Sequence, residues 1–313
     1  MTVRIGVDIG GTKTEAVVVE LADEPKVVAK DRVPTAKNEG YDAIVANTVA
    51  LIRGVAKSAG VALEGNVGVG MPGSVTSRNA DGTPSATPLV KNSNATVLNG
   101  RPFRADLMTA LGHEIAFSND ANCFALAEAT WGAARGGRVV FGVIMGTGVG
   151  GGVVIRDGAS PSGTARAWDG AQGIAGEWGH VVLDPAGPAC YCGRRGCIEQ
   201  YLSGPAIERT YEERAGEKRT LADIAARIDS DDVARTLLDE RIEIFGRAFA
   251  TLIDVLDPDV VVLGGGVSNL DLWTGRGRDA VARWVFNDTL ETKIVRHALG
   301  DSAGVLGAAL LPT

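Results

Sequence analysis

Several features that would classify a protein at once are missing from this sequence. Lys and Arg (31) are outnumbered by Asp and Glu (38), so the chain lacks the excess of positive charge by which proteins bind nucleic acid. No apolar run is long enough to span a bilayer. The residues after Met1 lack the basic, apolar and small-residue succession of a secretory signal. These absences predict a cytoplasmic protein that acts on small molecules, without nucleic-acid or membrane partners.

Aromatic residues (5%), histidine (three) and cysteine (four) are also scarce, whereas glycine is abundant, with 42 residues. A hydrophobic content of 45% and a charged content of 22% are ordinary for a soluble globular protein. At 313 residues the chain exceeds the usual size of one hydrophobic core. Two lobes with a cleft between them are therefore expected.

The apolar pattern predicts the alternating strands and helices of an α/β protein. Strands are expected at residues 3–9, 15–19, 67–70, 114–117, 139–145, 153–155 and 260–263, and helices at 41–58, 121–133, 232–256 and 304–311. Residues 74–102 form a predicted long loop, and 165–204 have little regular period. A strand, a glycine turn and a second strand occur at 3–19 and again at 139–155, which suggests two lobes with related openings.

Both glycine turns are candidate phosphate sites. The first lies in Asp8-Ile9-Gly10-Gly11-Thr12-Lys13, where the glycines let backbone N–H groups approach an anion and Thr and Lys add donors. An ordinary hairpin turn is the alternative. The second, at 146–152, contains G-x-G-x-x-G, but a strand follows it where a dinucleotide fingerprint requires a helix. No G-x-x-x-x-G-K-[ST] occurs, which excludes a Walker-type loop. The two Gly-Thr turns instead suggest that phosphates are held from both lobes.

Asp120, in Asn119-Asp120-Ala121-Asn122, lies at a predicted strand-to-helix junction. A carboxylate there would accept the proton of an attacking hydroxyl, the role of the base in phosphoryl transfer. An Asp just before a helix is equally typical of an N-cap. The spacing alone leaves both interpretations open.

Three of the four cysteines, Cys190, Cys192 and Cys197, lie in one short stretch, and His180 precedes them. One imidazole and three thiolates form a closed tetrahedral set, as in structural zinc sites. A disulfide or simple burial is the competing interpretation. Cys123 lies on a predicted helix beside Phe124 and is expected in the core.

Two carboxylates, Glu177 and Glu199, bracket the cysteine segment. A loop held by a metal would keep them rigid enough to hydrogen-bond sugar hydroxyls. Solvation at the surface is the alternative for either one alone.

Taken in order, these motifs closely resemble those of the ROK family of sugar kinases and repressors, over essentially the whole chain. The most specific match is the cysteine block through Glu199, and the glycine turns, including Leu263-Gly264-Gly265-Gly266-Val267, are the least specific. The resemblance implies a two-lobe actin-like ATPase fold of the hexokinase and ribonuclease H type, with a small zinc-binding insertion. It also implies MgATP as donor, structural Zn²⁺ and a homodimer. We expect one lobe to hold residues 1–122 and 299–313, and the other 123–298.

Site residues follow from the same resemblance, position by position. Asp120 corresponds to the catalytic base. The sugar is expected to contact Asn94, Asn119, Asp120, Glu177, His180 and Glu199, and zinc is expected on His180, Cys190, Cys192 and Cys197. ATP is expected to contact Asp8, Gly10, Gly11, Thr12, Lys13, Thr147 and Gly148, and its adenosine Gly264, Gly265 and Gly266.

Within the family, the stretch 90–103 and the ending 300–304 look most like bacterial fructokinases of broad hexose tolerance. The sequence therefore predicts ATP-dependent fructose 6-phosphorylation (EC 2.7.1.4), extending to mannose and glucose. One departure is Val97, where such fructokinases often have Trp. The alternatives are an N-acetylglucosamine or N-acetylmannosamine kinase or a glucokinase, and more remotely phosphorylation of an acyl or sialic-acid-related substrate. A sugar-responsive repressor would carry a helix-turn-helix module ahead of residue 8, and a silent sugar-binding protein would not need Asp120.

Overall fold

Two five-stranded sheets organise the chain, and the computed structural model describes residues 2–76, 81, 83, 85–158 and 163–311. In the first sheet the strand order is β3-β2-β1-β4-β7. Its strands are β1 (Thr2–Ile9), β2 (Lys13–Leu21), β3 (Lys26–Pro34), β4 (Val67–Met71) and β7 (Ala116–Asn119). In the second sheet the order is β10-β9-β8-β11-β12. Its strands are β8 (Val139–Met145), β9 (Val149–Arg156), β10 (Ala165–Ala167), β11 (Val260–Gly264) and β12 (Lys293–Arg296).

The two sheets share one topology. In each, the first strand pairs antiparallel with the second across a glycine turn, and the third strand extends that antiparallel edge. Two further strands add in parallel on the other side of the first strand. This repetition confirms the related openings predicted from residues 3–19 and 139–155, and with them a two-lobe α/β architecture.

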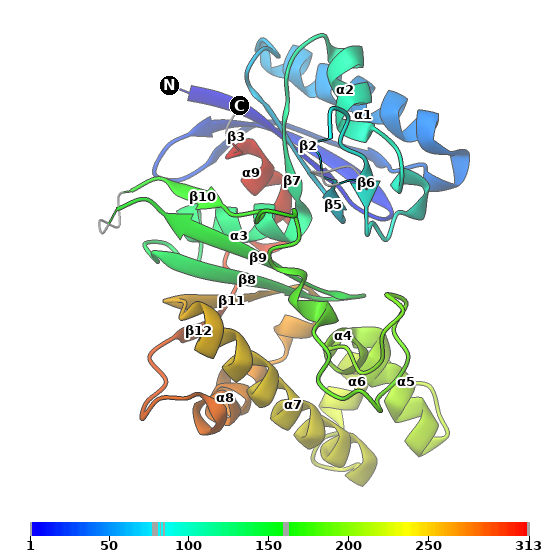
Figure 1. Ribbon diagram of the computed structural model, residues 1–313, viewed down its shortest axis with the longest axis vertical. Coiled ribbons are helices and arrows are strands. Elements are labelled where there is room, and N and C mark those ends of the chain that lie inside the picture. Colours follow the sequence, from blue (N-terminus) through cyan, green and yellow to red (C-terminus); the bar gives the residue numbers. More distant parts are fainter. Residues whose placement is uncertain (1, 77–80, 82, 84, 159–162, 312–313) are drawn as a thin grey trace.

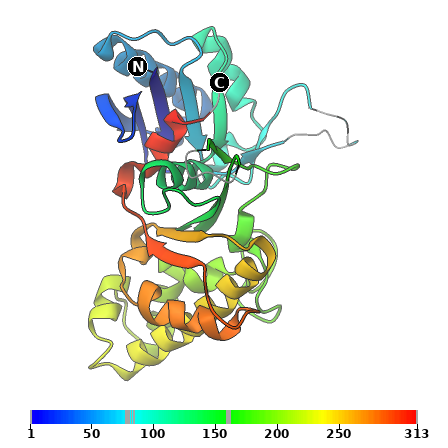
Figure 2. The same ribbon diagram turned by 90° about the vertical axis from the view of Figure 1, so that its left-hand side faces the viewer.

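Helices cover the sheets in three layers, as Figures 1 and 2 show. The outer face of the first sheet packs against α1 (Tyr41–Ala59) and α2 (Phe103–Leu111). Between the sheets lie α3 (Asp120–Trp131) and α9 (Ala303–Ala309), in a core that contains residues of β2, β8, β9 and β11. The far side of the second sheet carries α4 (Glu199–Leu202), α5 (Gly204–Ala215), α6 (Leu221–Ala226), α7 (Asp232–Leu256) and α8 (Arg278–Trp284). None of the described helices is both long and apolar enough to cross a membrane.

Glycine determines how closely α3 approaches its neighbours. A Cβ atom at Gly152 of β9 would overlap the backbone of Ala121, and one at Gly307 of α9 would overlap that of Cys123. A larger residue at Gly152 would therefore push α3 away from β9, and one at Gly307 would push it away from α9. The absence of these side chains fixes the amino end of α3, and Asp120 with it, against the second sheet.

Most predicted elements are confirmed, α7 to the residue and α1, α3 and α9 within about two residues, and Cys123 is fully buried as expected. The predicted loop 74–102, part of which lies outside the described residues, instead contains the antiparallel ribbon of β5 (Ser74–Val75) and β6 (Val90–Lys91). The segment 165–204 holds β10 and α4 as well as turns. The sequence did not predict β3, α2, α8 or β12. The expected boundary at residue 122 falls inside α3, which packs against both sheets, so the lobe limits remain a prediction.

Candidate active site

A cavity of 480 Å³ lies where the two sheets meet. Its wall comes from the ends of β4 and β7, the start of α3, the β8–β9 turn, and the segment 169–180. All six residues predicted to contact a sugar line it, namely Asn94, Asn119, Asp120, Glu177, His180 and Glu199. Val97 is absent from the described lining and packs instead against the core under α1 and α2. The fold thus gathers side chains that are 105 positions apart at the extremes of the sequence.

Asp120 is the first residue of α3, and its neighbour Asn119 is the N-cap. The Asn119 Oδ1 accepts the N–H of Ala121 at 2.8 Å, while its Nδ2 donates to the Gly73 carbonyl at 2.8 Å. Both functional groups of Asn119 are therefore engaged in holding the junction. The Asp120 Oδ1 also accepts the Ala121 N–H, at 2.8 Å. Asn119 takes the cap role that the sequence left open for Asp120, and Asp120 stays in the cavity wall.

Two carboxyl groups between the sheets have raised pKa values. Burial raises the pKa of Asp120 above its ordinary value, and backbone hydrogen bonds at Ala121 oppose the rise. Burial also raises the pKa of Asp8, with the charges of Asp120 and Glu15 adding to it and Lys13 opposing it, to about 7. A carboxyl group with a raised pKa is a stronger proton acceptor once it is ionised. The raised pKa of Asp120 therefore suits its carboxylate to accept a proton.

The β8–β9 turn meets the cavity at Thr147 and Gly148. Glu199, the first residue of α4, accepts the N–H of Val149 on its Oε2 at 3.0 Å, and a Cβ at Gly148 would lie 2.6 Å from the same oxygen. The N–H of Gly204 donates to the Gly146 carbonyl at 2.9 Å. The segment that follows the cysteines is thereby fastened to the second glycine turn, and Glu199 joins the two parts of the site.

The β1–β2 turn forms the hairpin expected for Gly10, Gly11 and Thr12. The N–H of Gly10 donates to the Lys13 carbonyl at 2.9 Å, and the hydroxyl of Thr35 donates to the Gly10 carbonyl at 2.7 Å. The side chains of Thr12 and Lys13 are exposed. None of the residues from 8 to 13 lines the 480 Å³ cavity. Their phosphate-binding role remains a prediction, linked to the cavity by the charge interaction of Asp8 with Asp120.

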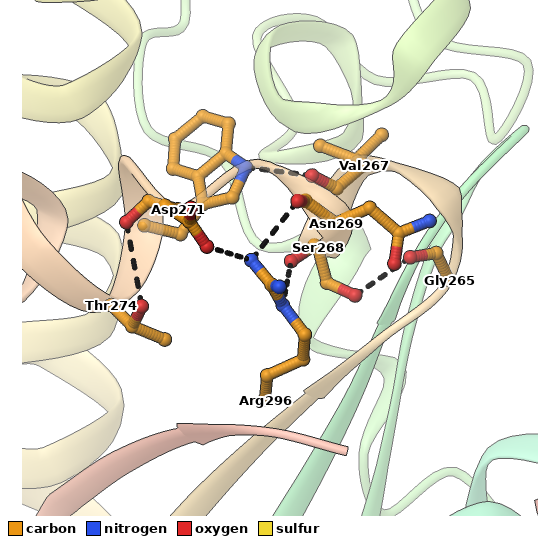
Figure 3. A network of polar contacts seen from close by, with 8 residues as sticks. Gly265, Val267, Ser268, Asn269, Asp271, Thr274 and Arg296 are labelled. Atoms are coloured by element: carbon orange, nitrogen blue, oxygen red, sulfur yellow. Dashed lines mark hydrogen bonds and ion pairs between the residues drawn. The ribbon is translucent and has the colours of Figure 1, made fainter. Parts of the chain in front are cut away.

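The third glycine turn, Gly264 to Gly266, leaves β11 beside the end of β8, and a Cβ at Gly265 would overlap the Met145 carbonyl. It also lies outside the lining of the cavity. Arg296 of β12 holds the chain just beyond it, as Figure 3 shows. The guanidinium donates from Nε to the Ser268 carbonyl at 2.9 Å, and from one NH₂ to the Asn269 carbonyl at 3.0 Å and the Asp271 carboxylate at 2.8 Å. This network gives the predicted adenosine turn a fixed outer edge.

The four predicted zinc ligands come together, with one donor atom of each within 4.8 Å of all the others. The Sγ atoms of Cys192 and Cys197 are 3.6 Å apart, and Cys190 Sγ is 3.6 Å from His180 Nδ1. Tetrahedral zinc with Zn–S bonds of about 2.3 Å would separate two sulfurs by roughly 3.8 Å. All four cysteines of the chain are free. The donor set fits a closed structural zinc site and contradicts the disulfide alternative.

Glu177 and His180 share one short 3₁₀ turn, Glu177–His180. Burial raises the pKa of Glu177 above its ordinary value. The neighbouring Trp178 is buried against Phe141 and Phe249 and anchors the turn in the core of the second lobe. The anchor turns the two polar side chains toward the cavity.

Sequence reasoning missed several lining residues. Asp169 accepts hydrogen bonds from the Ser118 hydroxyl at 2.6 Å and from Asn122 Nδ2 at 2.9 Å, while Asn122 Oδ1 accepts the Val153 N–H at 3.1 Å. These contacts tie β7, α3, β9 and the segment 169–176 together around the cavity. Tyr191, inside the cysteine block, was missed as well and lines the cavity. Asn122 stood in a recognised motif, but nothing local distinguishes Asp169 from an ordinary turn residue.

Comparison with known proteins agrees with this geometry. The sequence pattern of the ROK family matches residues 4–313. An N-acetyl-D-glucosamine kinase of Vibrio cholerae is 35% identical over 317 residues, covering 98% of each chain. The crystal structure of a ROK hexokinase from Thermus thermophilus superposes with a TM-score of 0.83 at 31% identity, covering 99% of this chain and 98% of that one.

A ROK family glucokinase from Streptomyces griseus, solved in complex with glucose and AMPPNP, has a TM-score of 0.74 at 29% identity and covers 98% of each chain. These likenesses confirm the two-lobe actin-like fold expected from the sequence. The specific resemblance to fructokinases is not confirmed, because the curated relative above is an N-acetylglucosamine kinase. By sequence pattern over nearly its whole length and by its fold, this chain belongs to the ROK family.

Proposed function

We propose that this protein transfers the γ-phosphoryl group of ATP to a hydroxyl of N-acetylglucosamine. Its place among the sugar kinases of the ROK family rests on full-length likeness to kinases that include a hexokinase and a glucokinase. The choice of sugar rests on the 35% identity to an N-acetyl-D-glucosamine kinase across 98% of both chains. That relative favours N-acetylglucosamine over fructose as the acceptor sugar.

The observation that carries the chemistry is the position of Asp120. It lies in the wall of a polar cavity between the sheets, at the rigid start of α3, with a pKa raised by burial. In the proposed reaction the carboxylate takes the proton of the attacking sugar hydroxyl. The new bond from that oxygen to the γ-phosphorus forms as the bond between the γ-phosphorus and the β–γ bridging oxygen breaks, and ADP leaves.

Glu177, Glu199 and Asn94 would orient the sugar by hydrogen bonds, and His180 lines the same cavity beside them. ATP would lie across the two Gly-Thr turns, whose glycines admit backbone N–H groups to the phosphates. Asp8 is the carboxylate that would hold magnesium, which would neutralise charge on the ATP phosphates when bound. Zinc on His180 and the three cysteines would hold the sugar side of the cavity in shape.

Replacing Asp120 by Asn tests the proposed base. The variant keeps the shape of the side chain but accepts no proton, so kcat is expected to fall by about 10²- to 10⁴-fold. Binding of the sugar, measured by calorimetry without ATP, is expected to persist. Asp42→Asn provides the control, since the Asp42 side chain is 98% exposed on α1. Full activity of the Asp120→Asn variant would contradict the proposed role of Asp120 as the base.

The substrate is tested by coupled ADP-release assays with N-acetylglucosamine, N-acetylmannosamine, glucose, fructose and mannose. The ranking of kcat/KM measures preference between competing sugars. N-acetylglucosamine is expected to rank first. If fructose ranks first instead, the result supports the fructose preference predicted from the sequence. If none of the five sugars causes ADP release, the result contradicts hexose kinase activity.

A further inference from the structure

Tyr191 is unusual for an aromatic residue because it is 71% exposed. It lies between two predicted zinc ligands, Cys190 and Cys192, in a tight turn closed by backbone hydrogen bonds from Cys190 to Arg194 and from Gly193 to Cys190. The residue nevertheless lines the 480 Å³ cavity, and it also lines a neighbouring cavity of 1110 Å³. Tyr191 thus lies on the partition between the candidate sugar site and a second hollow.

The partner of Tyr191 is His180. The phenolic oxygen lies 2.9 Å from His180 Nε2, and the two rings meet edge to face with centroids 5.1 Å apart. The other nitrogen of the imidazole, Nδ1, faces Cys190 Sγ at 3.6 Å within the proposed zinc site. The two nitrogens of His180 are therefore divided between the thiol cluster and Tyr191.

This division determines the direction of the hydrogen bond. An imidazole nitrogen that binds a metal uses its lone pair, so the proton of the neutral ring sits on the other nitrogen. The Nε2–H of His180 then donates to the oxygen of Tyr191. The hydroxyl hydrogen of Tyr191 remains available, and among the described residues His180 is the one hydrogen-bond partner that the tyrosine oxygen has. A donor is left at the edge of the sugar cavity.

The neighbouring cavity offers an apolar surface beside Tyr191. Its wall includes the apolar side chains of Ile174, Val181 and Val182, which are 42%, 43% and 37% exposed. It shares Asn94, Glu177 and His180 with the sugar cavity. An acetamido group has an oxygen that only accepts hydrogen bonds and a methyl group that is apolar. A hydroxyl at the same position of a plain hexose would gain nothing from the apolar wall.

We propose that Tyr191 is a specificity-determining residue, which donates its hydroxyl hydrogen to the carbonyl oxygen of an N-acyl group on the acceptor sugar, with the acyl methyl toward the adjoining apolar cavity. The assignment deepens the function proposed above and depends on a sugar binding beside His180. It makes the cysteine block a recognition element, in addition to a support for the cavity wall.

Tyr191→Phe tests the assignment because it keeps the ring and removes only the hydroxyl. Loss of one hydrogen bond is expected to weaken binding of N-acetylglucosamine by roughly 5- to 10-fold, measured by calorimetry on the full chain without ATP. Binding of glucose is expected to change by less than about twofold, and KM for ATP is expected to stay the same. Tyr201→Phe is the matched control, since Tyr201 lines neither cavity.

Zinc content and thermal stability are measured on the same samples. The assignment holds if Tyr191→Phe retains its zinc and loses affinity selectively for the N-acetylated sugar. It is overturned by unchanged affinity, by an equal loss for both sugars, by loss of zinc, or by a wild type that binds N-acetylglucosamine no more tightly than glucose. Failure of the proposed kinase function is distinguished by the absence of ADP release. Calorimetry would still measure how Tyr191→Phe changes the affinity for each sugar.

Discussion

The pH dependence of stability that Asp8 causes can be measured directly, and it reports on the electrostatics between the two lobes. Burial, Asp120 and Glu15 raise its pKa in the folded protein from 3.8 to about 7. In the unfolded chain an aspartate releases its proton near pH 4. The folded state therefore holds more protons than the unfolded state between pH 4 and 7, and the free energy of unfolding falls as pH rises through that window.

The size of the fall follows from the same values. One unit of pKa corresponds to 1.36 kcal/mol, so the rise from 3.8 to about 7 amounts to about 4 kcal/mol lost between pH 4 and pH 8. The entropy of unfolding is about 2.1 cal/mol/K per residue. Over 313 residues, the loss of about 4 kcal/mol therefore lowers Tm by about 6 °C. The stabilising contribution is complete below pH 4 and absent above pH 8.

Asp8→Asn removes the titration, so this part of the pH dependence should disappear. Against the wild type, the variant is expected to melt about 6 °C higher at pH 8.5 and at nearly the same temperature at pH 4.5. Thermal unfolding is followed across that range without nucleotide or magnesium, with Asp42→Asn as the exposed control. Parallel curves for the wild type and Asp8→Asn would refute the buried, charge-crowded environment described for Asp8.

Two further predictions concern groups outside the sugar cavity. Arg296→Lys loses the planar pair of donors that holds the carbonyls of Ser268 and Asn269. The KM for ATP is therefore expected to rise roughly 10-fold while the affinity for sugar stays unchanged. Steady-state kinetics with each substrate varied in turn measure both, and an unchanged KM for ATP would contradict the role of Arg296. Glu128 is fully buried on α3 and accepts the N–H groups of Ala133, Ala298 and Leu299. Glu128→Gln is therefore expected to lower the free energy of unfolding by about 2–4 kcal/mol. Urea denaturation measures this loss, and a midpoint equal to that of the wild type would contradict the role of Glu128.

Sequence alone determined the parts of this protein that depend on local chemistry. The period of apolar residues placed α7, α1 and the core strands because a helix or strand must turn one face inward. Residue types and close spacing identified the cysteine block, since three thiols within eight residues of a reduced chain point to metal. The ordered series of motifs also indicated the two-lobe fold, and the structure confirmed it.

Only the tertiary structure decided which side chains share the site. Asn119 became the helix cap and left Asp120 in the cavity wall because β7 brings it against the Gly73 carbonyl. The pairing of Asn122 with Asp169, 47 residues away, depends on how α3 packs on β9. Tyr191 meets His180 because the cysteine block folds back against the turn that carries His180. Such contacts join residues from different elements, and a local sequence pattern does not specify how distant elements pack together.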